Sequence, residues 1–232
     1  MGGGRGQGSQ GGPRRRAAGT GPGRLRSAGA SRLSRARPVA SYLRLLAPYT
    51  ALSAILFGLG VVLGLVALRF DPAAAYGVMR GVEDFIGAAR GLSRLEIFLF
   101  IVANNGFKVL VMMILGVVVG LAPVFFLISN GVVVAVVGAT YAQMEGAAVV
   151  IASLLPHGVV ELAAVFVGAA AGLHLGTLMV QRIRGRPVAF LPWLGAAWRL
   201  FVRLLLPMVI VAAAIETWVT PALAEMVRQA AG

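Results

Sequence analysis

Long uncharged apolar segments constrain this chain more than any other feature of its sequence. Ala47 to Leu68 contains no charged residue, and a helix that rises 1.5 Å per residue crosses the ~30 Å hydrocarbon core of a bilayer over such a length. Only 12% of the 232 residues are charged, against about a quarter in soluble domains. The sequence therefore predicts an all-α integral membrane protein with about five transmembrane helices.

Breaks in the apolar pattern divide residues 38–232, which we interpret as a single multipass membrane domain. We expect the spans at residues 47–69, 106–122, 124–142, 158–180 and 204–220. Over residues 72–91 apolar positions recur at helical spacing among charges, which predicts an amphipathic helix on the outer face. Polar breaks before the second and fourth spans predict broken or re-entrant half-helices.

The N-terminal tail, residues 1–37, consists mostly of Gly, Arg, Ser and Pro and is predicted to be disordered. Ten of the 21 basic residues precede residue 45, and none of the eight acids does. Such a cluster favours a cytoplasmic N-terminus that contacts anionic lipid, and nucleic-acid binding is not expected. Arg182, Arg184 and Arg186 agree with this orientation, since four crossings return the chain to the cytoplasm. A fifth crossing places the C-terminus outside the cell membrane.

Two segments of the chain share a pattern that predicts a parallel internal repeat, about residues 95–142 and 147–220. Each has an apolar approach, a polar break and a glycine-spaced span. The glycines after the two breaks, together with one further position, are expected to form helix-packing faces: Gly116, Gly120, Gly168, Gly172 and Gly176. These glycine faces also suggest a homodimer.

Polar residues inside apolar segments are the candidate functional residues, because an ionisable group in hydrocarbon costs roughly 2.5–3.5 kcal/mol. The positions are Asn104, Asn105, Lys108, Pro156, His157, Gly158, Glu161 and Glu216. His157 and Glu161 share a helix face because they lie four residues apart. The topology puts these groups in the outer half of the membrane at similar depth. They either satisfy one another and fix helix packing, or form a ligand, ion or proton site.

Catalytic and metal-binding motifs are not recognised in the sequence, so neither an enzyme nor a cofactor is expected. His157 and Glu161 lack the paired-histidine spacing of zinc proteases. His174 is the only other histidine in the sequence, and there is no Cys. We therefore expect no metal site.

The polar motifs resemble the stage II sporulation protein M family of multipass membrane proteins. The resemblance covers roughly residues 40–225 and leaves out the basic tail. It is carried by Asn104-Asn105, Asn130-Gly131, Leu155-Pro156-His157-Gly158-Val159-Val160-Glu161 and Ala214-Ile215-Glu216-Thr217-Trp218-Val219-Thr220-Pro221. The family-like positions are Asn105, Pro156, His157, Gly158, Glu161 and Glu216.

The resemblance implies a function as well as a fold. Founding members of the family act in engulfment, as membrane partners of peptidoglycan-degrading enzymes. The chain is thus expected to be a non-enzymatic scaffold or assembly partner in cell-envelope or membrane remodelling. The alternative is a small transporter or channel that uses a polar layer of His157, Glu161, Glu216 and Lys108.

Overall fold

The computed structural model describes residues 1–2, 39–71 and 73–231, so the predicted disordered tail lies outside the described residues apart from its first two. Regular secondary structure in the described ranges is helical throughout, without a strand. Five segments are long and apolar enough to cross a membrane: Val39–Phe70, Arg94–Leu115, Leu121–Glu145, Ala147–Ile183 and Phe190–Ala230. The predicted all-helical membrane fold with five spans is therefore confirmed.

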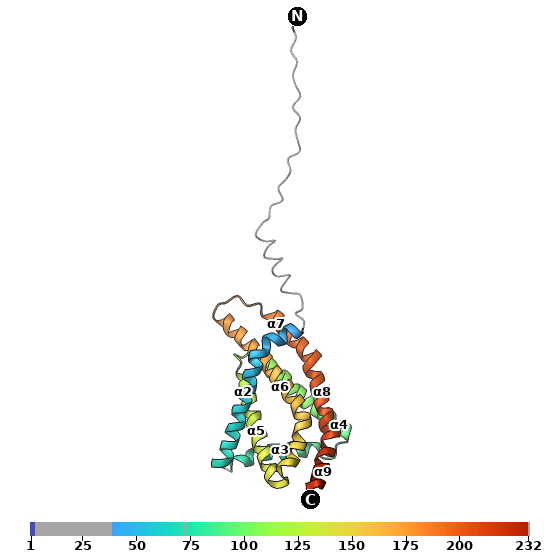
Figure 1. Ribbon diagram of the computed structural model, residues 1–232. Coiled ribbons are helices and arrows are strands. Elements are labelled where there is room, and N and C mark those ends of the chain that lie inside the picture. The colour runs from blue at the N-terminus through green and yellow to red at the C-terminus, as the bar shows by residue number, and fades with distance from the viewer. Residues whose placement is uncertain (3–38, 72, 232) are drawn as a thin grey trace. The chain divides into compact units, whose positions relative to one another are not determined.

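The described elements are helices that follow one another along the chain (Figure 1). They are α2 (Val39–Phe70), α3 (Ala74–Ala89), α4 (Arg94–Leu115), α5 (Leu121–Glu145), α6 (Ala147–Ile183), α7 (Phe190–Leu200), η1 (Phe201–Leu205), α8 (Leu206–Ala214), η2 (Ile215–Val219) and α9 (Thr220–Ala231). The start of α2 lies at the end of the bundle that also holds α7, called here the α7 side. The helix α3 and the C-terminus lie at the opposite end, the α3 side.

Helices α2 and α5 pack through a backbone contact. A methyl group added at Gly60 would meet the Ile128 carbonyl, and one added at Gly131 would meet the Phe57 carbonyl. Neither position has space for a side chain. Small residues at such a crossing let two membrane helices approach so closely that their main chains are in van der Waals contact.

Helices α4 and α6 cross through the glycines expected from the sequence. An added methyl at Gly116 would meet the backbone of Gly172, and one at Gly176 would meet the backbone of Gly120. Gly168 lies against the Val109 side chain. All of these contacts lie within one chain, so the glycine faces on which the homodimer prediction rests are already covered here.

The start of α4 is specified by a capping box. The Ser93 hydroxyl accepts a hydrogen bond from the Glu96 backbone N–H at 3.3 Å, and the Glu96 carboxylate accepts one from the Ser93 N–H at 2.7 Å. Two N–H groups that the helix leaves unpaired are thereby satisfied. The helix therefore begins at Arg94, earlier than the apolar pattern alone indicates.

The predicted breaks within α4 and α6 are wrong. Helix α4 continues through Asn104 and Asn105, and α6 continues through Pro156 as one helix of 37 residues. Proline removes one helical N–H donor, but in a membrane the unmade bonds of a true break cost more, so packed helices tolerate it. The interruption lies instead between α4 and α5, where Val119 (φ 55°) and Gly120 (φ 76°) turn the chain.

Helices α4 and α6 run in the same direction. Lys108 interacts electrostatically with Glu161, and further along both helices Gly116 contacts Gly172. The residue numbers of the contacting positions increase along both helices, as a parallel pair requires. The internal repeat itself stays a prediction.

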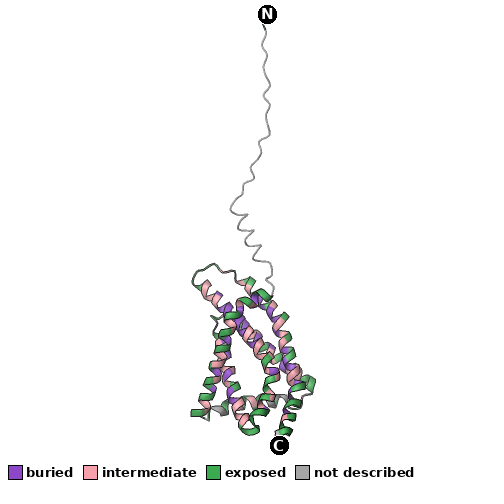
Figure 2. Cartoon of the chain, viewed as in Figure 1, coloured by how far each residue is buried: buried purple, intermediate pink, exposed green. Residues whose placement is uncertain are grey.

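Burial divides the bundle into contact faces and outward faces, as Figure 2 shows. Large apolar side chains such as Ile55, Leu59 and Leu63 of α2 are exposed. On a soluble protein such a surface is an interaction site or an aggregation hazard, but on a membrane span it is the face that lipid covers.

Candidate functional site

The candidate site is a polar layer made by three spans. We define it as Lys108 of α4, His157 and Glu161 of α6, and Glu216 of η2. One ligand atom from each of His157, Glu161 and Glu216 lies within 4.8 Å of the other two. His157 and Glu161 share a face of α6, while Glu216 reaches them only because the last span packs against that helix.

Lys108 contributes the positive charge of the layer. It interacts electrostatically with both Glu161 and Glu216. If His157 is neutral and both carboxyl groups are ionised, the layer carries one more negative than positive charge. Because uncompensated charge within a membrane is expensive, a further proton or a cation would then neutralise the layer.

His157 is held in a fixed orientation. Its side chain is buried, with 9% of its surface exposed. The ring Nδ1 lies 3.2 Å from the hydroxyl oxygen of Thr220, which is also buried. A hydrogen bond at one ring nitrogen fixes the imidazole plane and leaves the other nitrogen for a ligand.

Glu216 lies in a π-helical turn. The segment η2 widens the helix over Ile215–Val219, between α8 and α9. Such turns inside α-helices are often found at functional sites, because the extra residue redirects side chains. Sequence periodicity did not reveal this turn, although the Glu216 charge pointed to the position.

The remaining predicted positions surround the layer. Asn104 and Asn105 lie one turn before Lys108 on α4, where the Asn104 amide donates a hydrogen bond to the Asn105 carbonyl oxygen at 2.8 Å. A methyl group added at Gly158 would meet no atom within 4 Å. Gly158 faces open space, therefore, while the glycines Gly116 and Gly172 serve close packing.

A cavity of about 420 Å³ reaches the layer from one direction. Asn130 and Val134 of α5 line it on one side, and His157 and Glu161 of α6 on the other. Most other lining side chains are apolar, so the cavity has largely apolar walls with a few polar groups. Concave apolar pockets with a few convergent polar groups are typical binding sites.

A second cavity of about 540 Å³ reaches the layer from another direction. It lies between the start of α4, at Arg94 and Ile97, and the end of the last span, at Glu216 and Trp218. The neighbouring carboxylates Glu161 and Glu216 therefore line different cavities. The layer therefore contributes one carboxylate to the lining of each cavity.

A further buried polar cluster, on the α7 side, was missed by sequence reasoning. The Tyr42 hydroxyl lies 3.3 Å from Nδ1 of His174, and the Tyr49 hydroxyl lies 3.1 Å from the Thr177 hydroxyl. The His174 ring also packs edge-on to Trp193, with 4.9 Å between ring centroids. Tyr42 and Tyr49 lie two turns apart on one helix face, which was the available signal.

Comparison with known proteins places the fold in a family. A search of curated proteins and a search of solved structures each find no significant match. The family model described as stage II sporulation protein M matches residues 53–221, which include three of the five spans whole, part of the other two, and the entire polar layer. The chain therefore belongs to the stage II sporulation protein M family.

Proposed function

We propose that the chain is a membrane-embedded, non-enzymatic assembly partner in cell-envelope remodelling. Family membership supports this class of membrane protein. The position and charge of α3 are the observation that supports the assembly role. That helix is too short and too charged to span a bilayer. It offers a polar surface at the end of the bundle where the C-terminus also lies (Figure 1).

The surface of α3 is charged on its outward face. Arg80, Glu83 and Asp84 are exposed, while Val78 and Val82 are half-buried. The helix thus rests on the bundle through an apolar stripe and keeps its charges available, as an interfacial amphipathic helix does. Proteins bound there would contact both signs of charge.

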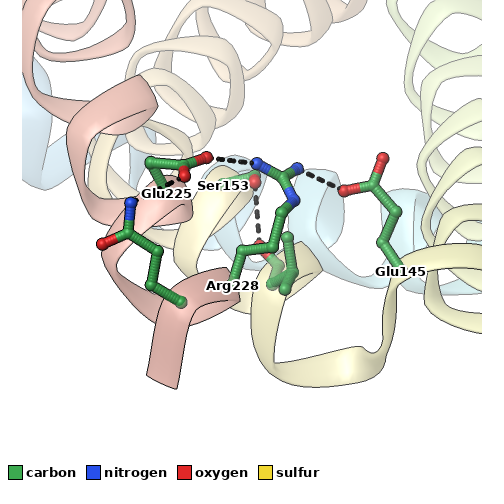
Figure 3. A network of polar contacts seen from close by, with 6 residues as sticks. Glu145, Ser153, Glu225 and Arg228 are labelled. Atoms are coloured by element: carbon green, nitrogen blue, oxygen red, sulfur yellow. Dashed lines mark hydrogen bonds and ion pairs between the residues drawn. The ribbon is translucent and has the colours of Figure 1, made fainter. Parts of the chain in front are cut away.

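Helix α9 extends this polar surface on the same side. Arg228 forms ion pairs with Glu225, at 2.9 Å, and with Glu145 at the end of α5, at 2.5 Å (Figure 3). The bridge joins the last helix to the α5–α6 hairpin. It supports the proposal that the α3 side is a defined platform.

Orientation follows from the charge distribution in this proposal. The exposed Arg182 lies in the last turn of α6, and the exposed Arg184 and Arg186 follow between α6 and α7, all on the α7 side. Arginine-rich loops stay in the cytoplasm. The α3 platform then faces the cell exterior, where the proposed partners, enzymes that degrade peptidoglycan, do their work.

The test is site-specific photo-crosslinking in the native cell, with a crosslinking residue on α3. We expect the wild-type chain to capture a cell-wall-degrading enzyme that mass spectrometry identifies. The triple variant Arg80→Glu, Glu83→Lys and Asp84→Lys should lose that product. The double variant His157→Ala and Glu161→Gln, altered only inside the bundle, should keep it. Capture that is unchanged by the triple variant would contradict the proposal.

A small transporter or channel is the second candidate, favoured by two cavities, one lined by Glu161 and the other by the neighbouring Glu216. The discriminating experiment reconstitutes the purified chain in liposomes and measures pH-dependent flux. If Glu161→Gln and His157→Ala leave the fold and the crosslink intact but abolish a flux, the polar layer serves transport, which the assembly role does not explain.

A further inference from the structure

We propose that His157, Glu161 and Glu216 form a binding site for one divalent transition-metal ion, of the Zn²⁺ or Mn²⁺ type. The inference does not depend on the assembly role. It starts from the donor atoms, which lie within 4.8 Å of one another on two different spans. Atoms that share one ion at about 2.1 Å each lie at most about 4.2 Å apart. Side-chain rotations that move the donor atoms by about an ångström would therefore let all three bind one ion.

The donor set selects the class of metal. One imidazole nitrogen with two carboxylate oxygens suits Zn²⁺, a borderline ion that binds both donor types, and also Mn²⁺, a harder ion that binds carboxylates well. Mg²⁺ and Ca²⁺ prefer sites made of oxygen alone. With three protein ligands, the fourth position would be open to water or another ligand, and both His157 and Glu161 line the first cavity.

Thr220 supports the same assignment from the next layer of contacts. Its hydroxyl lies 3.2 Å from His157 Nδ1, so it can accept the Nδ1 proton and leave Nε2 as the lone-pair donor. Metal-binding histidines nearly always have such a partner, and its removal typically lowers metal affinity about 10–100-fold. Glu216 lies in η2, and Thr220 is the first residue of α9, which follows directly. One packing contact therefore brings together a ligand and a ligand-orienting group.

Lys108 supplies a competing charge. It interacts electrostatically with the same two carboxylates, and its side chain is exposed on one side of α4. A divalent cation would neutralise the charges of Glu161 and Glu216 in place of Lys108, and it would repel the lysine ammonium group. Because a long flexible side chain can swing away, Lys108 and the ion would exchange at the layer.

The experiment uses the full chain, purified in detergent with an affinity tag that contains no histidine. Zn²⁺ and Mn²⁺ binding is measured by calorimetry and by metal analysis after dialysis. We expect one ion per chain. Thr220→Val should weaken Zn²⁺ binding about 10–100-fold, and His157→Gln, Glu161→Gln and Glu216→Gln should each weaken it further.

Matched controls separate ligand loss from general damage. His174→Gln removes the other buried histidine of the same helix, and Glu145→Gln removes an exposed glutamate. Both should retain wild-type affinity. Lys108→Gln should raise Zn²⁺ affinity at least about fivefold, a gain that misfolding cannot produce. The exposed cation Arg90, changed to Gln, should have no such effect.

The proposal is overturned by any of three results. One is a stoichiometry near zero for the folded wild-type chain. Another is binding that survives Glu161→Gln and Glu216→Gln, which would place the ion elsewhere. The third is an affinity that falls when Lys108 is neutralised, since the lysine would then assist binding and not compete with it.

Discussion

Glu161 of α6 and Glu216 of η2 bring carboxylate oxygens within 4.8 Å of each other, although each side chain lines a different cavity. Two acids this close in a membrane need a compensating charge. Lys108 of α4 interacts electrostatically with both. Lys108 thus links the two acids, and with them three spans, which explains how an otherwise apolar bundle accommodates ionisable groups.

The first prediction concerns this compensation in the absence of metal. In EDTA, Lys108→Gln should lower the free energy of unfolding by about 1 kcal/mol or more, because it leaves two carboxylates without a cation. The double variant Lys108→Gln with Glu161→Gln should recover much of the loss. A double-mutant cycle of thermal unfolding in detergent measures the coupling. Additive effects would show that the two residues do not compensate each other.

The second prediction concerns the crossing of α2 and α5. Gly60→Ala should destabilise the chain by about 1–3 kcal/mol, because the added methyl meets the Ile128 backbone, which cannot rotate away. Gly58→Ala is the matched control in the same helix, since its methyl would meet no atom within 4 Å. Denaturation of both variants in one detergent gives the comparison. Equal stabilities would contradict the close crossing.

The third prediction concerns Pro156. Because α6 is continuous through this position, Pro156→Ala should leave helicity unchanged and keep or raise the thermal stability, by up to about 3 kcal/mol. The alanine restores a helical N–H donor. Circular dichroism and thermal unfolding measure both quantities. A loss of stability greater than about 1 kcal/mol would mean that the proline stabilises a break.

The fourth prediction concerns the buried cluster on the α7 side. Tyr42→Phe removes the hydroxyl that lies 3.3 Å from His174, and should cost about 1 kcal/mol of stability because the imidazole nitrogen loses a buried partner. Tyr76→Phe is the control, since Tyr76 is exposed on α3. If both variants unfold at the same temperature, the contact contributes nothing to stability.

Local sequence rules predicted some of this architecture and failed at particular residues. Apolar length predicted the five spans because a membrane imposes that length on any helix that crosses it. The four-residue spacing of His157 and Glu161 predicted their shared face. The predicted break at Pro156 was wrong. In a membrane, a true break would leave several backbone hydrogen bonds unmade, which costs more than the single bond that proline removes.

Packing determined the features that the sequence did not show. The predicted repeat, with an offset of 52 residues, would pair Gly116 with Gly168. In the structure Gly116 contacts Gly172, one turn further along. The register of two helices depends on which ridges and grooves meet, and a one-chain pattern does not contain that information. In the same way, the sequence placed Glu216 at the depth of His157 and Glu161, but only the tertiary fold shows that its carboxylate oxygen lies within 4.8 Å of their donor atoms.

X-ray absorption spectroscopy of the zinc-loaded chain tests the central claim most directly, namely that the polar layer is a binding site built by His157, Glu161 and Glu216. The wild-type spectrum should show one imidazole ligand together with oxygen donors at about 2.0–2.2 Å. The imidazole signal should persist in His174→Gln and disappear in His157→Gln. A spectrum without imidazole scattering, or one that only His174→Gln alters, would contradict the account.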